Sequence, residues 1–420
     1  MRIPTSVALA ALGGALVLGL TVAPAAQAAP ATSGCTTDAF GIAGKYGEFV
    51  LGDDVHSPDA EGAVAVGGNA DFSGGFSVGN ELTAAQVDAL PGRTSLVVRG
   101  DLVNGGSATV VMKGNAVVGG AVKDRALEMH NGTFAKKADL IDFDGEFAKL
   151  RAYSDALAKE AATSGASVSL DGNRLTLTGT DSGRNVFSVD ASKLEKAKEV
   201  FVKVPAGATT IVNVTGQSYD MATAGTTGFF LSGGKDFVLD DKLQSADDGA
   251  VRAKLLWNFP NADKIVKNSQ AAWPGSVLAP RAHLELGTAA PVNGSVWVAS
   301  LHGSGGAETH HFPFTGCLPE VPGTGTPTPG TTPSGTPSTT PPATTTPAPS
   351  ATPSGTATPS GTPSDSATPG APAPSASPSQ PEGDLATTGS GNMIPITVGG
   401  AAVVAAGAAL VVVARRRKRA

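Results

Sequence analysis

Short apolar stretches separated by glycine and by Asn or Asp recur in the first third of the region between residues 35 and 317. Each copy has a β-branched run, a Gly-Asn or Gly-Asp pair and, further on, two glycines: residues 64–69 with 74–75, 96–101 with 105–106, and 110–115 with 119–120. Because Gly, Asn and Asp tolerate positive φ, the chain can bend sharply at regular intervals. The pattern predicts short strands joined by corners, as in the coils of a β-solenoid, with a β-sandwich as the alternative.

A helical stripe interrupts this pattern. Its apolar side is Phe143, Phe147, Leu150, Ser154, Leu157 and Ala161, and its charged residues include Glu146, Lys149, Arg151 and Lys159. The spacing predicts one amphipathic helix over about 143–163, ended near Gly165 and packed along the solenoid. After it, residues 168–170 and 175–177 flank Asp171-Gly172-Asn173, which predicts a hairpin. Further strands are expected at 186–189, 199–204 and 210–214, so the predicted fold class is mainly β.

The amino-terminal segment has the pattern of a signal peptide. Met1 and Arg2 precede an apolar stretch from about residue 7 to 22, and Ala26-Gln27-Ala28 is a small-x-small site. We expect residues 1–28 to be removed by cleavage between Ala28 and Ala29. The sequence therefore predicts an exported protein.

Composition changes abruptly after the predicted domain. Residues 318–384 are almost only Pro, Thr, Ser, Gly and Ala, without Lys, Arg or aromatic residues. Such a segment cannot bury enough apolar surface to fold, and we expect a disordered linker. If proline holds it in polyproline II, it reaches up to about 200 Å at 3.1 Å per residue. O-glycosylation of its Thr and Ser residues is left open.

The last residues combine a polar motif, an apolar run and a basic tail. The motif is Leu385-Ala386-Thr387-Thr388-Gly389, the apolar run is 393–414 and the tail is 415–420. A helix over the run would be about 33 Å long, enough to cross a hydrocarbon core. The basic tail would stay cytoplasmic by the positive-inside rule. The alternative is a plain single-pass membrane anchor, which is disfavoured because an anchor alone needs no Leu385-Ala386-Thr387-Thr388-Gly389 motif at that distance.

The three parts in this order resemble the sorting signal of sortase substrates in Gram-positive bacteria. The L-A-x-T-G spelling is similar to the class E variant of high-GC actinobacteria. The resemblance implies that a class E sortase cleaves between Thr388 and Gly389 and joins Thr388 covalently to peptidoglycan. It further implies that Leu385 occupies an apolar pocket of the enzyme, and that the membrane helix is a transient attachment.

The net charge of the predicted mature chain argues against one class of partner. Removing residues 1–28 and the tail after the motif leaves 24 Lys and Arg (30 − 6) against 36 Asp and Glu, a net charge of −12. Nucleic acids bind surfaces with clustered Lys and Arg, so we expect no nucleic-acid partner.

The two cysteines, Cys35 and Cys317, stand at the edges of the predicted domain. In an exported chain they are expected to form a disulfide rather than remain free thiols.

The region from Phe40 to Gly316 resembles the choice-of-anchor A family. The matching segments, in order, are 185–187, 204–207, 211–216, 255–262, 275–280, 293–301 and 308–316. The resemblance implies a bacterial surface domain that precedes C-terminal anchoring signals and has no established enzyme activity. Residues 276–280 and 294–300 are also similar to coils of ice-binding-type adhesin domains, which implies a right-handed β-helix.

Three groups of residues are candidates for chemistry. Glu308, His310 and His311, with His302 upstream, could ligate zinc or supply a base, but the favoured interpretation is that Glu308 and one histidine bond the backbone to close the last coil. Asp53, Asp54, Asp59 and Glu61 could bind calcium, although a solvated loop is favoured. Trp257, Trp273 and Trp297 could stack on a glycan, but core positions are favoured. The sequence therefore predicts no metal site, cofactor or catalytic residue.

Together these patterns predict a cell-wall-anchored surface protein of a Gram-positive, actinobacterial-type bacterium. Its expected role is adhesion, through an unidentified surface ligand such as a glycan or matrix polymer. The alternative is a β-helix enzyme acting on extracellular or wall polysaccharide, which would need several carboxylates in one groove. Ice binding would need a regular array of threonines, and Thr176-Leu177-Thr178 is too short to provide one.

Overall fold

The computed structural model describes residues 35–303 and 305–320. The predicted signal peptide, most of the linker, the motif at 385–389, the apolar run at 393–414 and the basic tail lie outside these residues. Within the described ranges, no helix is both long enough and apolar enough to cross a membrane.

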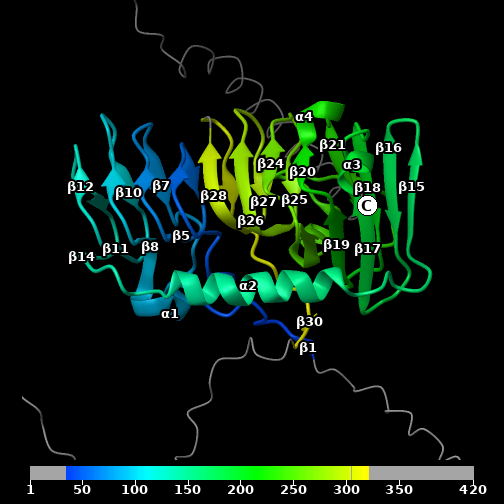
Figure 1. The fold of residues 1–420 in the computed structure, drawn as a ribbon, viewed down its shortest axis with the longest axis horizontal. Coiled ribbons are helices and arrows are strands. Elements are labelled where there is room, and N and C mark those ends of the chain that lie inside the picture. The colour runs from blue at the N-terminus through cyan, green and yellow to red at the C-terminus, as the bar shows by residue number, and fades with distance from the viewer. Residues whose placement is uncertain (1–34, 304, 321–420) are drawn as a thin grey trace, which may run out of the picture. The chain divides into compact units, whose positions relative to one another are not determined.

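Parallel strands stacked in three faces form a β-solenoid (Figure 1). The first face carries β14 (Phe134–Lys136), β11 (Asn115–Val118), β8 (Thr94–Val98), β5 (Val64–Val66), β2 (Glu48–Val50), β28 (Val296–Gly303), β26 (Ser276–Leu286), β23 (Leu255–Asn258), β19 (Thr209–Thr215) and β17 (Arg184–Asp190). The second, called the open face below, carries β12 (Val122–Lys123), β9 (Leu102–Val103), β6 (Ala70–Asp71), β3 (Asp54–Val55), the second halves of β28 and β26, β24 (Lys264–Lys267) and β20 (Ser218–Asp220). The third carries β13 (Glu128–Met129), β10 (Thr109–Val111), β7 (Phe76–Val78), β4 (Asp59–Ala60), β29 (Thr309–His310), β27 (Val292–Asn293) and β25 (Trp273–Pro274). The predicted solenoid is confirmed, and the sandwich alternative is wrong.

The coils are not stacked in chain order. β2 pairs on one side with β5 and on the other with β28, so that Phe49 lies opposite Trp297. The first coil therefore stands against the last coil at a seam in the middle of the solenoid. From this seam the coils of residues 64–136 extend to one end and those of 184–310 to the other, as the colours of Figure 1 show.

Helix α2 (Phe143–Ala158) runs along the first face and connects the two ends of the solenoid (Figure 1). Asp142 caps it by accepting the backbone N–H of Gly145 at 3.0 Å. Its buried side packs on outward side chains of the first face, and Phe147 stacks on Phe49. The helix ends earlier than the predicted residue 163, because Thr163 instead bonds the backbone of Val186 in β17.

The predicted hairpin is confirmed at β15 (Ser167–Asp171) and β16 (Arg174–Thr178), which pair antiparallel. Gly172 in its turn has a φ of 55°. The hairpin begins a smaller sheet that continues through β18 (Glu199–Lys203), β21 (Gly228–Ser232) and β22 (Val238–Leu239). The described residues also form three short α-helices, α1 (Ala84–Ala89), α3 (Ala191–Leu194) and α4 (Met221–Ala224), and four 3₁₀ helices.

Two of the three Gly-Asx pairs of the sequence repeat, at 68–69 and 100–101, join Asp53 in a ladder of side chains at one corner. The third pair, Gly114-Asn115, lies at another corner, at the start of β11, and Gly114 has the expected positive φ of 87°. Asp53 Oδ1 accepts the backbone N–H of Asn69 at 2.7 Å, Asn69 Oδ1 accepts that of Asp101 at 2.9 Å, and Asp101 Oδ1 accepts that of Ala121 at 2.8 Å. A Cβ on Gly100 would lie 2.5 Å from Asn69 Oδ1, and neither Gly68 nor Gly100 has positive φ. The expectation of positive φ is therefore wrong at these two corners, where glycine is required by close stacking.

Both ends of the domain meet at a disulfide. Cys35 and Cys317 are bonded, with their Cα atoms 5.3 Å apart, as the sequence predicts. Beside the bond, β1 (Cys35–Thr36) pairs antiparallel with β30 (Leu318–Pro319). Leu318 is fully buried, so the domain extends past residue 317, where the sequence places the start of the linker.

Candidate binding surface and pocket

The open face presents two rows of outward side chains. Both rows follow from the register of the paired strands. The first row is, in order, Lys123, Val103, Asp71, Val55, His302, Glu285, Val266 and Asp220. The second row is, in order, Ala121, Asp101, Asn69, Asp53, Ser300, His283, Lys264 and Ser218. All of them are partly or fully exposed. With neighbouring strands about 4.8 Å apart, the rows extend over roughly 34 Å. The face is therefore long enough to hold several units of a polymer.

Charges of both signs are paired along the open face. Lys123 and Asp101 approach to 2.7 Å, and Lys264 and Glu285 to 3.1 Å. The hydrogen bond and charge of Lys123 lower the pKa of the Asp101 carboxyl. These pairs hold polar side chains in order without creating a large area of one charge.

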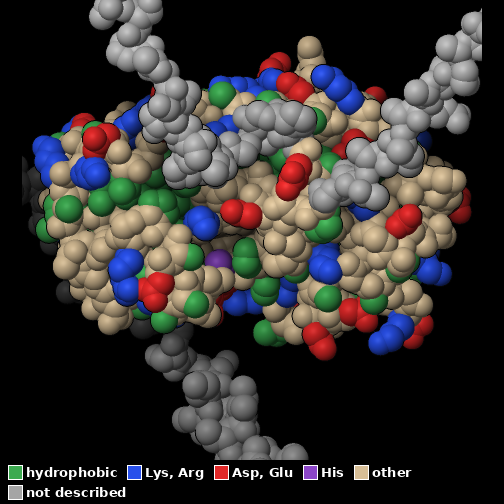
Figure 2. Space-filling model, turned by 90° about the horizontal axis from the view of Figure 1, so that it is seen from below, with side chains coloured by type: hydrophobic (Ala, Val, Ile, Leu, Met, Phe, Trp, Pro, Cys, Tyr) green, Lys and Arg blue, Asp and Glu red, His purple; other side chains and the backbone are tan. Residues whose placement is uncertain are grey.

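Figure 2 views the molecule from below. Lys and Arg side chains are interspersed there with Asp and Glu and with hydrophobic groups. The described Lys and Arg side chains in this view form no extended basic area, which is the feature that favours nucleic-acid binding.

On the third face, a pocket of about 450 Å³ opens where the segment around Lys242 lies against β25, β27 and β29. We call it the His310 pocket. It is lined by Thr227, Leu239, Asp240, Asp241, Lys242, Leu243, Gln270, Ala271, Ala272, Ala290, Pro291 and His310. The pocket therefore lies between a loop, which supplies residues 239–243, and the coils, which supply residues 270–272, 290–291 and 310.

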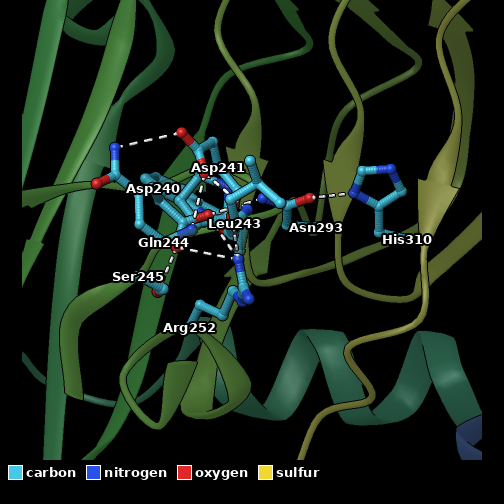
Figure 3. Close-up of polar contacts among 10 residues, drawn as sticks. Asp240, Asp241, Leu243, Gln244, Ser245, Arg252, Asn293 and His310 are labelled. Atoms are coloured by element: carbon cyan, nitrogen blue, oxygen red, sulfur yellow. Dashed lines mark hydrogen bonds and ion pairs between the residues drawn. The ribbon is translucent and has the colours of Figure 1, made fainter. Parts of the chain in front are cut away.

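A hydrogen-bonded network lies at the wall of this pocket (Figure 3). Asn293 Nδ2 donates to Asp240 Oδ2 at 2.8 Å, so Asn293 Oδ1 is the acceptor for His310 Nδ1 at 2.8 Å. Arg252 Nη1 lies 3.4 Å from both carboxylate oxygens of Asp240, and its guanidinium stacks 3.5 Å from the ring centroid of Phe312. The network fixes which nitrogen of His310 carries a proton.

Burial sets the protonation of this network. It raises the pKa of Asp240, against the opposing effect of Arg252. It lowers the pKa of His310, against Glu61 and Glu308. His310 Nε2 faces a carboxylate oxygen of Glu308 at 3.2 Å, so these two atoms must share a proton when they are in contact.

Three carboxylates gather beside the pocket, and we call them the acidic group: Asp59, Glu61 and Glu308. Glu61 is bonded to Lys242 and accepts the backbone N–H of His311 at 3.0 Å. Burial, Glu308 and Glu61 together raise the pKa of Asp59 to about 6. A carboxyl with that pKa can donate or accept a proton near neutral pH.

The structure separates residues that the sequence groups together. Asp53 belongs to the open face, Asp54 points into the interior, and Asp59 and Glu61 lie beside the pocket. The calcium hypothesis for these four residues is therefore wrong. The favoured solvated loop is also wrong for Asp54 and Glu61, which are buried.

The histidine candidates separate in the same way. His302 is exposed on the open face, whereas His310 is buried and bonds the side chains of Asn293 and Glu308. The sequence predicted that Glu308 and one histidine side chain bond the backbone. His310 instead contacts the side chains of Asn293 and Glu308. Sequence reasoning missed Asn293, Asp240 and Arg252, which belong to no local motif.

All three tryptophans are buried, which confirms their assignment to the core. Trp257 Nε1 donates to the carbonyl of Pro274 at 2.8 Å, and Trp297 Nε1 donates to that of Ala43 at 2.9 Å. They do not form a surface platform for a glycan.

Two solved structures are similar to the chain. An ice binding protein from an Antarctic Biological Consortium has 14% identity and a TM-score of 0.29, with 64% of this chain and 89% of that chain covered. An ice-binding protein from the Antarctic ascomycete Antarctomyces psychrotrophicus has 12% identity and a TM-score of 0.31, with 66% and 98% covered. No curated protein matches the chain. Residues 39–311 match the model of the family described as "Putative Ice-binding-like adhesive domain", and the chain therefore belongs to this family.

Proposed function

We propose that the protein is an exported adhesin whose solenoid binds an extended polar ligand through the open face. Membership of an adhesive-domain family over residues 39–311 carries this proposal. The long, two-rowed open face supports it, because a polymer can contact many outward side chains at once.

The chemistry of the open face favours a glycan or matrix polymer over ice. None of the outward positions named above is threonine, and most are charged or carry amide, hydroxyl or imidazole groups. Such side chains donate and accept hydrogen bonds, and the valines among them provide apolar contact. The ligand proposed is therefore rich in hydroxyl or amide groups.

We further propose that the protein is a choice-of-anchor A type surface protein held on the cell wall by a class E sortase. The motif at 385–389, the apolar run and the basic tail support this proposal. The Cys35–Cys317 disulfide supports export, because such bonds persist in oxidising compartments.

Adhesion is tested with the chain expected after both cleavages, residues 29–388, on arrays of glycans and matrix proteins. Val55→Glu with Val266→Glu adds two charges to one row of the open face and is expected to weaken binding at least tenfold. Ala148→Glu, on the exposed side of α2, is the matched control and should bind as the wild type does. Equal binding by all three proteins would exclude the open face as the binding site.

Anchoring is tested in cells. Thr388→Ala should leave the protein in the membrane fraction, whereas Thr387→Ala, at the variable position of L-A-x-T-G, should still be attached to peptidoglycan. Covalent attachment of the Thr388→Ala protein to purified peptidoglycan would show that the sorting proposal is wrong.

A polysaccharide-cleaving enzyme is the second candidate. It is favoured by one observation, the pKa of about 6 at Asp59 beside Glu61 and Glu308. This activity predicts release of reducing ends from a polysaccharide, lost in Asp59→Asn and kept in the open-face variant. If the wild-type protein releases none from the glycans that it binds, the adhesin remains and the enzyme is excluded.

A further inference from the structure

A second polar cluster lies inside the solenoid, at the seam between the first and last coils. Glu48 belongs to β2, Asp54 to β3, and His56 follows β3 directly. Their relative exposures are 0%, 0% and 2%. One nitrogen or oxygen atom from each side chain lies within 4.8 Å of the other two. Two acids and an imidazole thus converge in the interior of the solenoid.

The hydrogen bonding of His56 fixes its tautomer. Nε2 lies 3.1 Å from the carbonyl oxygen of Ala307, which can only accept, so Nε2 carries a hydrogen. In neutral His56 the lone pair is then on Nδ1, which is 3.3 Å from Glu48 Oε1. A lone pair and a carboxylate repel each other unless a proton or a cation lies between them. A bond from the other ring nitrogen to a carbonyl is also the usual support for a histidine that ligates a metal.

The carboxylates have unused acceptor atoms. Thr309 Oγ1 donates to Glu48 Oε1 at 2.6 Å and orients that group. Among the described residues, Glu48 Oε2 and both oxygens of Asp54 are buried without a hydrogen-bond partner. Buried carboxylate oxygens are normally paired, because leaving them bare costs several kcal/mol.

We propose that Glu48, Asp54 and His56 bind a divalent first-row transition ion such as Zn²⁺. His56 Nδ1 and one oxygen from each carboxylate are the ligands, and Thr309 and Ala307 hold them in place. A mixed nitrogen and oxygen set suits Zn²⁺, whereas Ca²⁺ and Mg²⁺ prefer oxygen alone. Two carboxylates, a neutral imidazole and a divalent cation also sum to zero charge, which suits an interior site.

The proposed site is structural, because it joins parts of the chain that are distant in sequence. Glu48, Asp54 and His56 come from the first coil, whereas Ala307 and Thr309 come from the last. An ion held there would fasten the seam on which both halves of the solenoid stack. Since the ligands are fully buried, the ion would be acquired during folding.

The test uses the chain expected after both cleavages, residues 29–388, with its disulfide intact. The protein is unfolded with guanidinium and a chelator, then refolded with Zn²⁺, Co²⁺, Ca²⁺ or no metal. We expect about one tightly held Zn²⁺ or Co²⁺ per chain by mass spectrometry of metals, a higher Tm with Zn²⁺, and d–d absorption bands with Co²⁺. Ca²⁺ should neither remain bound nor raise the Tm.

Matched variants locate the ion. Asp54→Asn and Glu48→Gln should lose the ion and the Co²⁺ bands, whereas Asp59→Asn and His310→Gln, beside the pocket, should keep both. If a variant does not fold, the Co²⁺ spectrum of the wild type still reports whether nitrogen and oxygen ligands surround the ion. A wild type that refolds without retaining Zn²⁺ or Co²⁺, or retains them equally in Asp54→Asn, would overturn the proposal.

Discussion

The solenoid contains two buried polar clusters, which differ in how many of their polar atoms have hydrogen-bond partners. In the first, each side-chain nitrogen and oxygen of Asp240, Asn293 and His310 has a partner. Arg252 supplies positive charge through Nη1, while its Nε is buried without a partner among the described residues. In the second, Glu48, Asp54 and His56, three carboxylate oxygens have no partner among the described residues. The comparison shows that the first cluster is completed by the protein itself and that the second needs a proton or a cation.

The difference follows from where each cluster is built. The network lies beneath a loop, and a loop can adjust until Arg252 and Ser245 reach Asp240. The seam cluster stands on stacked strands, whose positions are fixed by their pairing with neighbouring coils. Rigid strands hold ligands in a set geometry, which is what a metal site requires.

The largest expected effect comes from removing the charge that completes the network. Arg252→Met leaves Asp240 buried beside no cation, and breaking such a pair costs about 3–5 kcal/mol. Urea unfolding should show that loss in the free energy of unfolding, with Lys254→Met, whose ammonium is at an exposed contact, as the control. Adding Asp240→Asn to Arg252→Met should restore part of the stability. A loss below about 1 kcal/mol in the single variant would mean that Asp240 is already protonated.

The next effect comes from the centre of the network. Asn293→Leu leaves Asp240 Oδ2 and His310 Nδ1 each without their bond to the amide, which should cost about 1–3 kcal/mol for a buried group. Thermal unfolding measures the change, and Asn173→Leu at the exposed hairpin tip is the control. Equal stability of the two variants would show that water replaces the amide.

These residues also mark the limit of prediction from sequence. The solenoid was predicted from short strands followed by Gly-Asx corners, and the copies at 64–69 and 96–101 do occupy equivalent places in successive coils. The copy at 110–115 was aligned wrongly, because its strand is β10 on the third face. Helix α2 and the hairpin at Gly172 were also predicted, since periodicity and turn residues are local signals. The fold class could therefore be inferred before the structure.

Pairings between distant parts of the chain had no such signal. That β2 lies against β28 depends on contacts separated by about 250 residues. Asp240 lies in a loop and Arg252 in a three-residue 3₁₀ helix, and neither segment has a periodic pattern. His302 was grouped with His310 by proximity, yet the chain turns a corner between them and they face different sides. The charged residues Glu48 and Asp54, close to apolar neighbours, were the only local sign of the seam cluster.

A smaller effect is expected when Asp54 is changed in metal-free protein. Asp54→Asn removes no hydrogen bond made by a described residue, so we expect a change within about 1 kcal/mol of metal-free wild type, or a gain. Chemical unfolding in the presence of chelator measures it, and the isosteric Asp240→Asn, which loses several bonds, is the contrast. A loss at Asp54 as large as at Asp240 would mean that both clusters are completed by the protein, and the comparison would fail.

The smallest expected effect is the pH dependence of the contribution that His310, in the first cluster, makes to stability. Burial lowers the pKa of His310 from the usual 6.5, with Glu61 and Glu308 raising it and Lys242 lowering it. The unfolded chain then binds more protons than the folded chain as pH falls below about 6.5, so the contribution of His310 to stability is present above that pH and lost below it. Asp59, whose pKa is raised to about 6, has the opposite effect, because its contribution to stability increases as the pH falls below that value.

The free energy of unfolding is measured for wild type and His310→Gln at a series of pH values. Taking the difference between the two proteins removes the contributions that they share, including that of Asp59. The difference between them should shrink as the solution is acidified below pH 6.5, and a difference that grows instead would mean that Glu308 holds His310 in its charged form.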